Sequence, residues 1–157
     1  MKYYKLVKSQ FIEKPINEVF SFFEKPENLQ EITPPYLNFK IITPSPIKME
    51  VGQVISYKIK LRGIPIKWNS LISSYDPPNS FIDQQIKGPY AIWHHTHRFK
   101  EQDGGTLIED EVKYAIPFSI LGRILNYIFI KNDLKKIFLY REEKIGLIFK
   151  NDNIKGK

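Results

Sequence analysis

Between residues 37 and 116 the sequence alternates apolar and polar residues, and this two-residue period is its most constraining feature. Alternation of this kind is typical of β-strands that bury one face. The region is divided by short breaks rich in proline and glycine, such as "RGIP", "DPPNS" and "DGG". Because parallel strands need long crossovers, these short breaks predict an antiparallel meander. The six expected strands cover 39–43, 54–61, 66–73, 81–86, 90–99 and 106–116.

The flanking segments add one strand and three helices. Residues 3–12 alternate as a first strand, and apolar residues then recur with helical spacing after Pro15. A second short helix is expected to begin at Pro26, and the chain after Pro117 has the apolar stripe of a long helix ending near residue 149. A curved sheet with one apolar face needs a cover. We therefore predict an α+β fold in which about seven antiparallel strands wrap around the C-terminal helix and leave a cavity.

The composition excludes some classes of protein. The chain has 157 residues and no cysteine, which excludes disulfides, cysteine nucleophiles and cysteine-based zinc sites. This length suits one domain, which we place at 1–150, followed by a short flexible tail at 151–157. The N-terminus has no apolar core of signal-peptide length, so a cytoplasmic protein is expected. The net charge of +7 is spread along the chain, which favours a solvated surface over a nucleic-acid site.

The segment "GPYAIWHHTHRF" (88–99) holds all three histidines of the chain. Alternate side chains of a strand share a face. The inner face is therefore expected to carry Trp93, His95, His97 and Phe99, whereas His94 points outward. An Asp-Gly pair follows in "EQDGGT" and is a strong signal for a two-residue turn between paired strands.

This turn sets the register of the hairpin. Counting back from it places the inner faces of both strands against each other, as a buried face requires. A carboxylate in an apolar cavity is costly unless it is paired, so Asp110 is expected to pair with the histidine opposite. The predicted cross-strand pairs are Phe99 with Ile108, His97 with Asp110, His95 with Val112, and Trp93 with Tyr114.

Three interpretations of this polar patch remain open. Two histidines and one carboxylate match a metal site in number. The expected pairing of His97 with Asp110 competes with coordination, however, so we expect no bound metal. The patch can instead form the polar part of a ligand cavity, an acid/base pair of His97 and Asp110, or a structural element of the core.

Arg141 raises a related question, because it lies on the apolar stripe of the C-terminal helix. Its side chain can reach the edge of the core, pair with Asp110, or bind an anionic group of a ligand. Tyrosine and tryptophan side chains that share faces with apolar neighbours are expected to complete the wall. The candidate ligand-binding residues are Tyr57, Trp68, Trp93, His95, His97, Phe99, Asp110, Tyr114 and Arg141.

The order of elements and four motifs together resemble the START-like superfamily, also called SRPBCC. The superfamily includes Bet v 1-like allergens and polyketide cyclases/dehydrases, and a bacterial subgroup of small ligand-binding proteins is the most similar. The resemblance spans essentially the whole chain. It implies the helix-grip fold and a cavity that binds an apolar molecule, but no particular reaction. The motifs are "VFSFFEKPENLQEITPP" (19–35), "FIDQQIKGPYAIWHHTHRF" (81–99), "GGTLIEDEVKYAIPF" (104–118) and "IFLYR" (137–141).

These observations lead to one main hypothesis and two alternatives. The main hypothesis is a carrier of a small hydrophobic molecule, lipid-, polyketide- or isoprenoid-like, with a polar end. The first alternative is a metal-free cyclase or dehydratase in which His97, oriented by Asp110, moves a proton. The second is a lipid carrier that contacts an anionic membrane through residues 116–136, where lysines follow an apolar stretch. We expect no cofactor and no nucleic-acid partner, and either a monomer or a homodimer.

Overall fold

The structure, a computed structural model, describes the backbone of residues 1–155 and the side chains of residues 1–150. Seven strands form one antiparallel sheet in the order β1-β7-β6-β5-β4-β3-β2. The helical elements are α1 (Ile16–Phe23), the 3-10 helices η1 (Pro26–Gln30) and η2 (Pro35–Leu37), α2 (Ser119–Leu125), the π-helical η3 (Asn126–Ile130) and α3 (Lys131–Lys155). The strands are β1 (Tyr3–Ile12), β2 (Lys40–Ile41), β3 (Val54–Leu61), β4 (Ile64–Asp76), β5 (Ser80–Lys87), β6 (Ile92–Gln102) and β7 (Gly105–Ala115).

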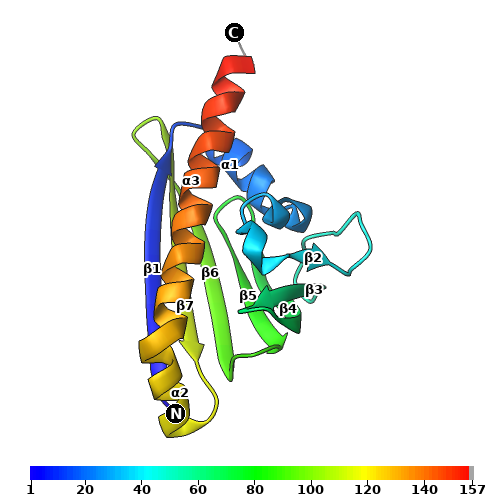
Figure 1. The fold of residues 1–157 in the computed structure, drawn as a ribbon. Coiled ribbons are helices and arrows are strands. Elements are labelled where there is room, and N and C mark those ends of the chain that lie inside the picture. Colours follow the sequence, from blue (N-terminus) through cyan, green and yellow to red (C-terminus); the bar gives the residue numbers. More distant parts are fainter. Residues whose placement is uncertain (156–157) are drawn as a thin grey trace.

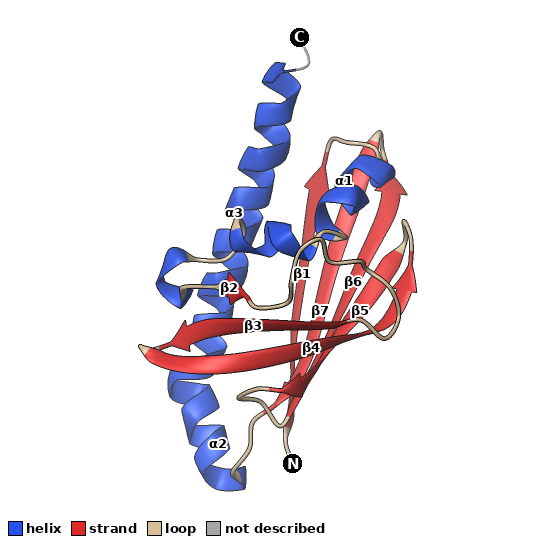
Figure 2. Ribbon diagram, turned by 90° about the vertical axis from the view of Figure 1, so that its right-hand side faces the viewer, coloured by secondary structure: helices blue, strands red, loops and turns tan. Residues whose placement is uncertain are grey.

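The sheet curves around the C-terminal helix. Strands β1, β7 and β6 run alongside α3, whereas β3 and β4 turn across it (Figures 1 and 2). The register of β4 against β5 shifts between Asn69 and Ser70 and again between Ile72 and Ser74. Such irregularities bend a strand and increase its twist, so they account for the change of direction between β5 and β4.

Helix α3 covers the concave face of the sheet with its apolar stripe. Leu134, Phe138, Ile145 and Phe149 are all buried. They belong to two core clusters, since Ile145 and Phe149 pack with α1 and the hairpin end of the sheet, and Leu134 and Phe138 with Val112 and Tyr114. The helix is therefore fixed to the sheet at both ends.

The β6–β7 hairpin has the register that its turn predicts. Asp103 and Gly104 both have positive φ angles, 45° and 77°, as a two-residue turn of the mirror-image type requires. The pairs Phe99–Ile108, His97–Asp110, His95–Val112 and Trp93–Tyr114 are all present.

The predicted architecture of seven antiparallel strands and a long C-terminal helix is confirmed. Several boundaries differ from the prediction, including those of β4 and β6, which are each shifted by two or three residues. The strand expected at 39–43 is only the two residues of β2, and the helix expected to end near 149 continues to Lys155. The predicted flexible tail at 151–157 thus begins within helical backbone, and its side chains, with residues 156–157, lie outside the described part.

Candidate functional site

A cavity of about 150 Å³ lies between the concave face of the sheet and α3. Its wall is mostly apolar and aromatic, and polar side chains enter it from β5, β6 and α3. An apolar cavity of this volume is sufficient for a molecule the size of benzene. The lining residues are Phe23, Pro26, Leu29, Ile32, Thr33, Leu37, Phe39, Met49, Ile55, Tyr57, Ile59, Leu61, Trp68, Ser70, Ile72, Phe81, Asp83, Tyr90, Trp93, His95, His97, Leu134, Ile137, Phe138 and Arg141.

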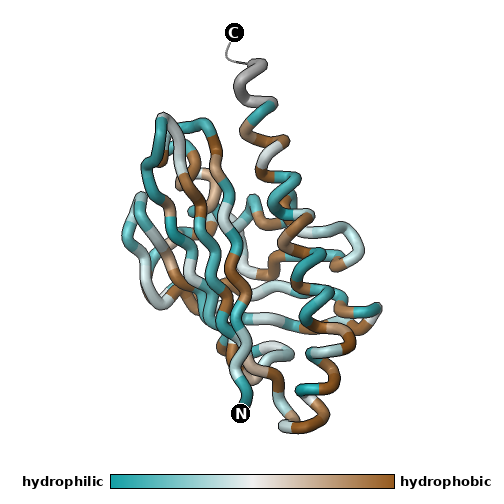
Figure 3. Tube along the Cα trace, turned by 90° about the vertical axis from the view of Figure 1, so that its left-hand side faces the viewer, coloured by the Kyte–Doolittle hydropathy of each residue, from teal (hydrophilic) through white to brown (hydrophobic). Residues whose placement is uncertain are grey.

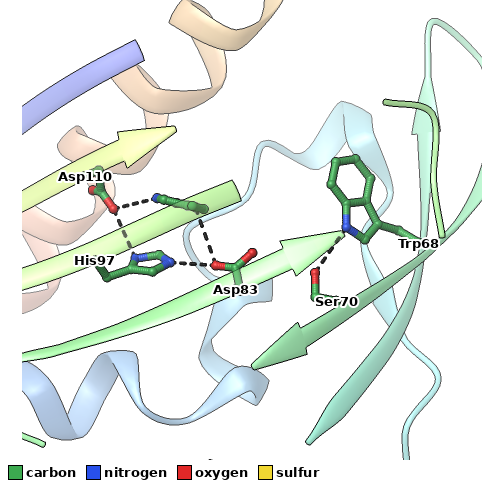
Figure 4. Close-up of polar contacts among 6 residues, drawn as sticks. Trp68, Ser70, Asp83, His97 and Asp110 are labelled. Carbon is green, nitrogen blue, oxygen red and sulfur yellow. Dashed lines mark hydrogen bonds and ion pairs between the residues drawn. The ribbon is translucent and has the colours of Figure 1, made fainter. Parts of the chain in front are cut away.

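Two carboxylates and two histidines form a connected polar cluster on three neighbouring strands. The Oδ1 atom of Asp110 lies 2.8 Å from His95 Nε2 and 3.1 Å from His97 Nδ1. On the opposite side, Asp83 Oδ2 lies 2.7 Å from His97 Nε2 and 3.6 Å from His95 Nδ1. Figure 4 shows the two carboxylates on opposite sides of the His97 ring.

The geometry assigns different protonation states to the two histidines. Burial lowers the pKa of His97, but its hydrogen bonds to Asp110 and Asp83 outweigh this effect and raise the pKa. An imidazole that donates from both ring nitrogens is an imidazolium. Burial lowers the pKa of His95, and the charge of His97 lowers it further, so His95 is neutral and donates from Nε2 to Asp110.

The carboxylates are ionised for the same reason. Burial would raise the pKa of Asp110, but the hydrogen bonds from His95 and His97 hold it well below its usual range. Burial also acts against Asp83, and there the hydrogen bond from His97 and the charges of both histidines lower the pKa. The cluster therefore holds two negative charges and one positive charge.

Arg141 brings a second positive charge to this region from α3. Its guanidinium carbon lies 5.0 Å from the ring centre of Phe138. Its Nε atom is buried and has no hydrogen-bond partner among the side chains and backbone that the structure describes. A buried donor without a partner is costly, so Arg141 presents an unsatisfied hydrogen-bond donor at the cavity.

Aromatic side chains form one wall of the cavity. Tyr57 stacks on Trp68 with a centroid distance of 5.8 Å, and Trp93 meets Trp68 edge-on at 5.3 Å. Tyr90 contacts both tryptophans. The indole nitrogen of Trp68 donates to Ser70 Oγ at 3.1 Å (Figure 4). The wall therefore consists of aromatic rings packed on one another, and the indole N–H of Trp68 is paired inside the protein.

Six of the nine candidate ligand-binding residues line the cavity, and three do not. Phe99 packs at the centre of the core cluster beneath α1, 5.2 Å from the ring of Phe20. Tyr114 stacks on Tyr4 and donates its hydroxyl to Asn126 Oδ1 at 3.0 Å. Asp110 lies behind the two histidines. The six lining residues are Tyr57, Trp68, Trp93, His95, His97 and Arg141.

Asp83 is the member of the cluster that sequence analysis did not identify. It pairs with His95 across β5 and β6, and Phe81 pairs with His97. The alternation in "FIDQQI" placed Asp83 on the same face as Phe81, which was the available signal. The connection from β5 to β6 is longer than a two-residue turn, so no turn signal predicted the register that brings Asp83 to the histidines.

His94, the third histidine, lies on the other face of β6, as predicted. Its cross-strand neighbours are Lys113 and Gln84. It contributes nothing to the cluster and offers a matched control for substitutions of the other two histidines.

A second notable surface lies on α2 and η3, outside the cavity. The side chains of Ile120, Leu121, Ile124, Tyr127 and Ile128 are exposed there, with Tyr127 85% exposed. We call this set the α2–η3 apolar face, and Figure 3 shows it as an apolar run at the start of the helical segment. Exposed basic residues surround it: Arg123, Lys131, Lys135 and Lys136. Among the described helices, none combines the length and apolarity needed to cross a membrane.

Comparisons with known proteins agree with this geometry. The sequence profile of the family described as polyketide cyclase/dehydrase and lipid transport matches residues 12–132. No protein with a curated description matches the chain.

Solved structures share the fold at low sequence identity. CV1439 from Chromobacterium violaceum has a TM-score of 0.71 and 12% identity, covering 92% of this chain and 96% of that one. Ara h 8.0201 has a TM-score of 0.62 and 14% identity, covering 92% and 98%. The ginseng major latex-like protein 151 from Panax ginseng has a TM-score of 0.61 and 10% identity, covering 94% and 97%. The predicted helix-grip fold and the resemblance to the SRPBCC superfamily are confirmed.

Proposed function

The chain belongs to the polyketide cyclase/dehydrase and lipid-transport family, and on this premise we propose that it binds a small hydrophobic molecule in the cavity beneath α3. The observation that carries the proposal is the composition of the wall. Aliphatic and aromatic side chains surround a space that only a few polar groups enter, and the carboxylate, imidazole and guanidinium groups among them come from β5, β6 and Arg141. Binding sites for apolar ligands commonly have such a wall with a few polar groups that fix orientation.

The polar end of the ligand is expected to be an acidic or strongly accepting group. Arg141 supports this expectation, because its buried Nε has no hydrogen-bond partner within the described residues. A carboxylate or an acidic hydroxyl on the ligand would accept from the guanidinium and satisfy it. An apolar molecule without an acceptor would leave the donor buried and unsatisfied.

A matched pair of probes tests this proposal. Benzoate and benzyl alcohol share a ring that fits a cavity of about 150 Å³ and differ only in the head group, and both tryptophans line the cavity and report binding by fluorescence. We expect both to bind, with benzoate tighter by about 10- to 150-fold, because a hydrogen bond to a charged group contributes about 1.5–3 kcal/mol. Arg141→Met should remove this preference. Absence of saturable binding by either probe would contradict the proposal.

A catalytic function is the alternative that one observation favours. His95 is the neutral histidine, and its Nδ1 faces the cavity side of the cluster, so it could accept a proton from a bound substrate. His97, proposed from the sequence as the base, already donates from both nitrogens and is better suited to hold charge. If the protein is a cyclase or dehydratase, His95→Gln should abolish turnover while His94→Gln leaves it unchanged.

The α2–η3 apolar face supports a further role as a carrier that collects its ligand from a membrane surface. An exposed apolar face flanked by lysines is the pattern of helices that lie in an anionic lipid interface. The exposed basic residues that flank this face and the net charge of +7 favour an anionic bilayer over a second copy of the chain, since two copies would repel each other.

A further inference from the structure

The ring nitrogens of His95 and His97 are divided between the two carboxylates in a regular way. Each histidine directs one nitrogen to Asp110 Oδ1, at 2.8 and 3.1 Å. Each directs its other nitrogen to Asp83 Oδ2, at 3.6 and 2.7 Å. Asp110 thus contacts both rings from one side, and the nitrogens that converge on Asp83 lie on the cavity side, because Asp83 lines the cavity and Asp110 does not.

We propose that Asp83, His95 and His97 form a binding site for a first-row divalent transition-metal ion such as Zn²⁺ or Fe²⁺. One ligand atom from each residue lies within 4.8 Å of the others. Metal bonds of about 2.0–2.2 Å place neighbouring ligand atoms roughly 3–3.5 Å apart, so small side-chain rotations complete the site. The proposal is independent of which apolar molecule the cavity holds.

Asp110 has the role of an outer carboxylate in this site. Histidine ligands of metal sites commonly donate their second ring N–H to a carboxylate, which fixes the ring and makes the ligating nitrogen more basic. The Nε2–H of His95 and the Nδ1–H of His97 make this contact with the same oxygen. From the sequence alone, the pairing of His97 with Asp110 argued against a metal site. In the structure this pairing leaves the opposite nitrogen of His97 available, and it therefore supports coordination.

The charges of the cluster also suit a divalent cation. Asp83 and Asp110 place two carboxylates next to the ring nitrogens of both histidines, and a divalent ion complements this arrangement. The ion takes the place of the proton between His97 Nε2 and Asp83 Oδ2, and this proton is released to solvent. Arg141 then remains as a positive charge beside the ion and can pair with an anionic group of a ligand.

The donor set selects the class of metal. Two imidazole nitrogens and one carboxylate oxygen suit Zn²⁺ or Fe²⁺, whereas Ca²⁺ and Mg²⁺ prefer oxygen ligands and Cu⁺ prefers sulfur. Three protein ligands leave at least one coordination position open. Because all three ligands line the cavity, the open position faces the space where a ligand or a water molecule would bind.

Metal titration of the untagged, chelator-treated full chain tests the site. We expect calorimetry with Zn²⁺, and absorption spectroscopy with Co²⁺ as a coloured substitute, to give one ion per chain. Asp83→Asn and His97→Gln should each abolish this one-to-one binding. His94→Gln, on the outer face of the same strand, should leave it unchanged, and Asp110→Asn should weaken it about 10–100-fold, as expected for an outer carboxylate.

A second measurement covers the case in which a substitution prevents folding. The chain has three histidines, so the imidazole nitrogens of the unsubstituted protein can be followed individually by NMR. Zn²⁺ should shift the signals of His95 Nδ1 and His97 Nε2 and leave those of His94 in place. Absence of stoichiometric binding, binding that survives Asp83→Asn in folded protein, or a shift of His94 alone would overturn the proposal.

Discussion

At the scale of single residues, Asp110 is a carboxylate that contacts both buried histidines through one oxygen. Its side chain is buried, and one oxygen accepts hydrogen bonds from two histidines, one of them charged. Removing one partner of a buried ion pair leaves the other charge uncompensated, which costs far more than the pair itself contributes.

We predict that Asp110→Ala lowers the free energy of unfolding by about 3–5 kcal/mol. Urea denaturation of the metal-free protein measures this change. Glu109→Ala, which removes the neighbouring carboxylate of the same strand on its outer face, should change stability by no more than about 0.5 kcal/mol. Equal effects of the two substitutions would show that the histidine contacts do not stabilise the fold.

The place of Asp83 in the polar cluster is the feature of the site that the sequence did not predict. The pairing of His97 with Asp110 followed from the Asp-Gly turn, because a two-residue turn sets the register of both strands. Asp83 could not be placed in the same way, because β5 and β6 are joined by a longer connection and β5 is displaced by the irregularities in β4. The alternation of faces along each strand therefore did not predict the proposed metal site, which includes Asp83.

At the scale of elements, the C-terminal helical segment has two distinct surfaces. Along α3 the apolar stripe faces the sheet, whereas along α2 and η3 the apolar side chains face outward and the buried Asn126 faces inward. Helical periodicity predicted the helix, but it could not show that the apolar face changes side within it. The π-helical η3 separates the two parts.

We predict that Leu121→Asp abolishes binding to anionic lipid vesicles while Leu147→Asp has no effect. The two leucines are matched, since 55% of Leu121 and 53% of Leu147 is exposed, but only Leu121 belongs to the α2–η3 apolar face. Vesicle sedimentation measures binding, which should weaken at high salt because the lysines contribute by charge. No sedimentation of the unsubstituted protein at low salt would exclude the membrane role.

The hairpin of β3 and β4 is connected to the start of α3 by one residue of its turn. Arg62 forms hydrogen bonds of 3.0 and 3.1 Å to the two carboxylate oxygens of Asp133 and lies over the ring of Phe129. Leu61 and Leu134, the chain neighbours of this ion pair, both line the cavity. The pair therefore holds two walls of the cavity together at one edge.

We predict that Arg62→Met increases the rate at which a bound ligand dissociates, by up to about fivefold. The limit follows from the contribution of an exposed ion pair, which is at most about 1 kcal/mol. Stopped-flow tryptophan fluorescence measures the rate. Lys60→Met, an equivalent loss of charge on the adjoining strand β3, should leave the rate unchanged, and a slower rate in Arg62→Met would contradict the assignment.

At the scale of the whole molecule, curvature decides which inward-facing residues reach the cavity. Parity placed Phe99, Tyr114 and Trp93 on one face, and they do share it. Only Trp93 lines the cavity, however, because α1 packs on Phe99 at one end of the sheet and the start of the helical segment packs on Tyr114 at the other. The order of elements predicted the fold and the helix that covers the sheet. How strongly the sheet bends depends on packing between elements, which the alternation within a single strand does not predict.

The central claim is that an apolar molecule binds inside the protein, between the sheet and α3. The chain has two tryptophans, and both line the cavity. Their indole N–H groups give two signals in a two-dimensional ¹⁵N–¹H NMR spectrum that are well separated from the backbone signals. Titration with benzoate should shift both indole signals until the site is saturated at one ligand per chain. Binding detected by calorimetry with both indole signals unmoved would place the ligand elsewhere and contradict the account.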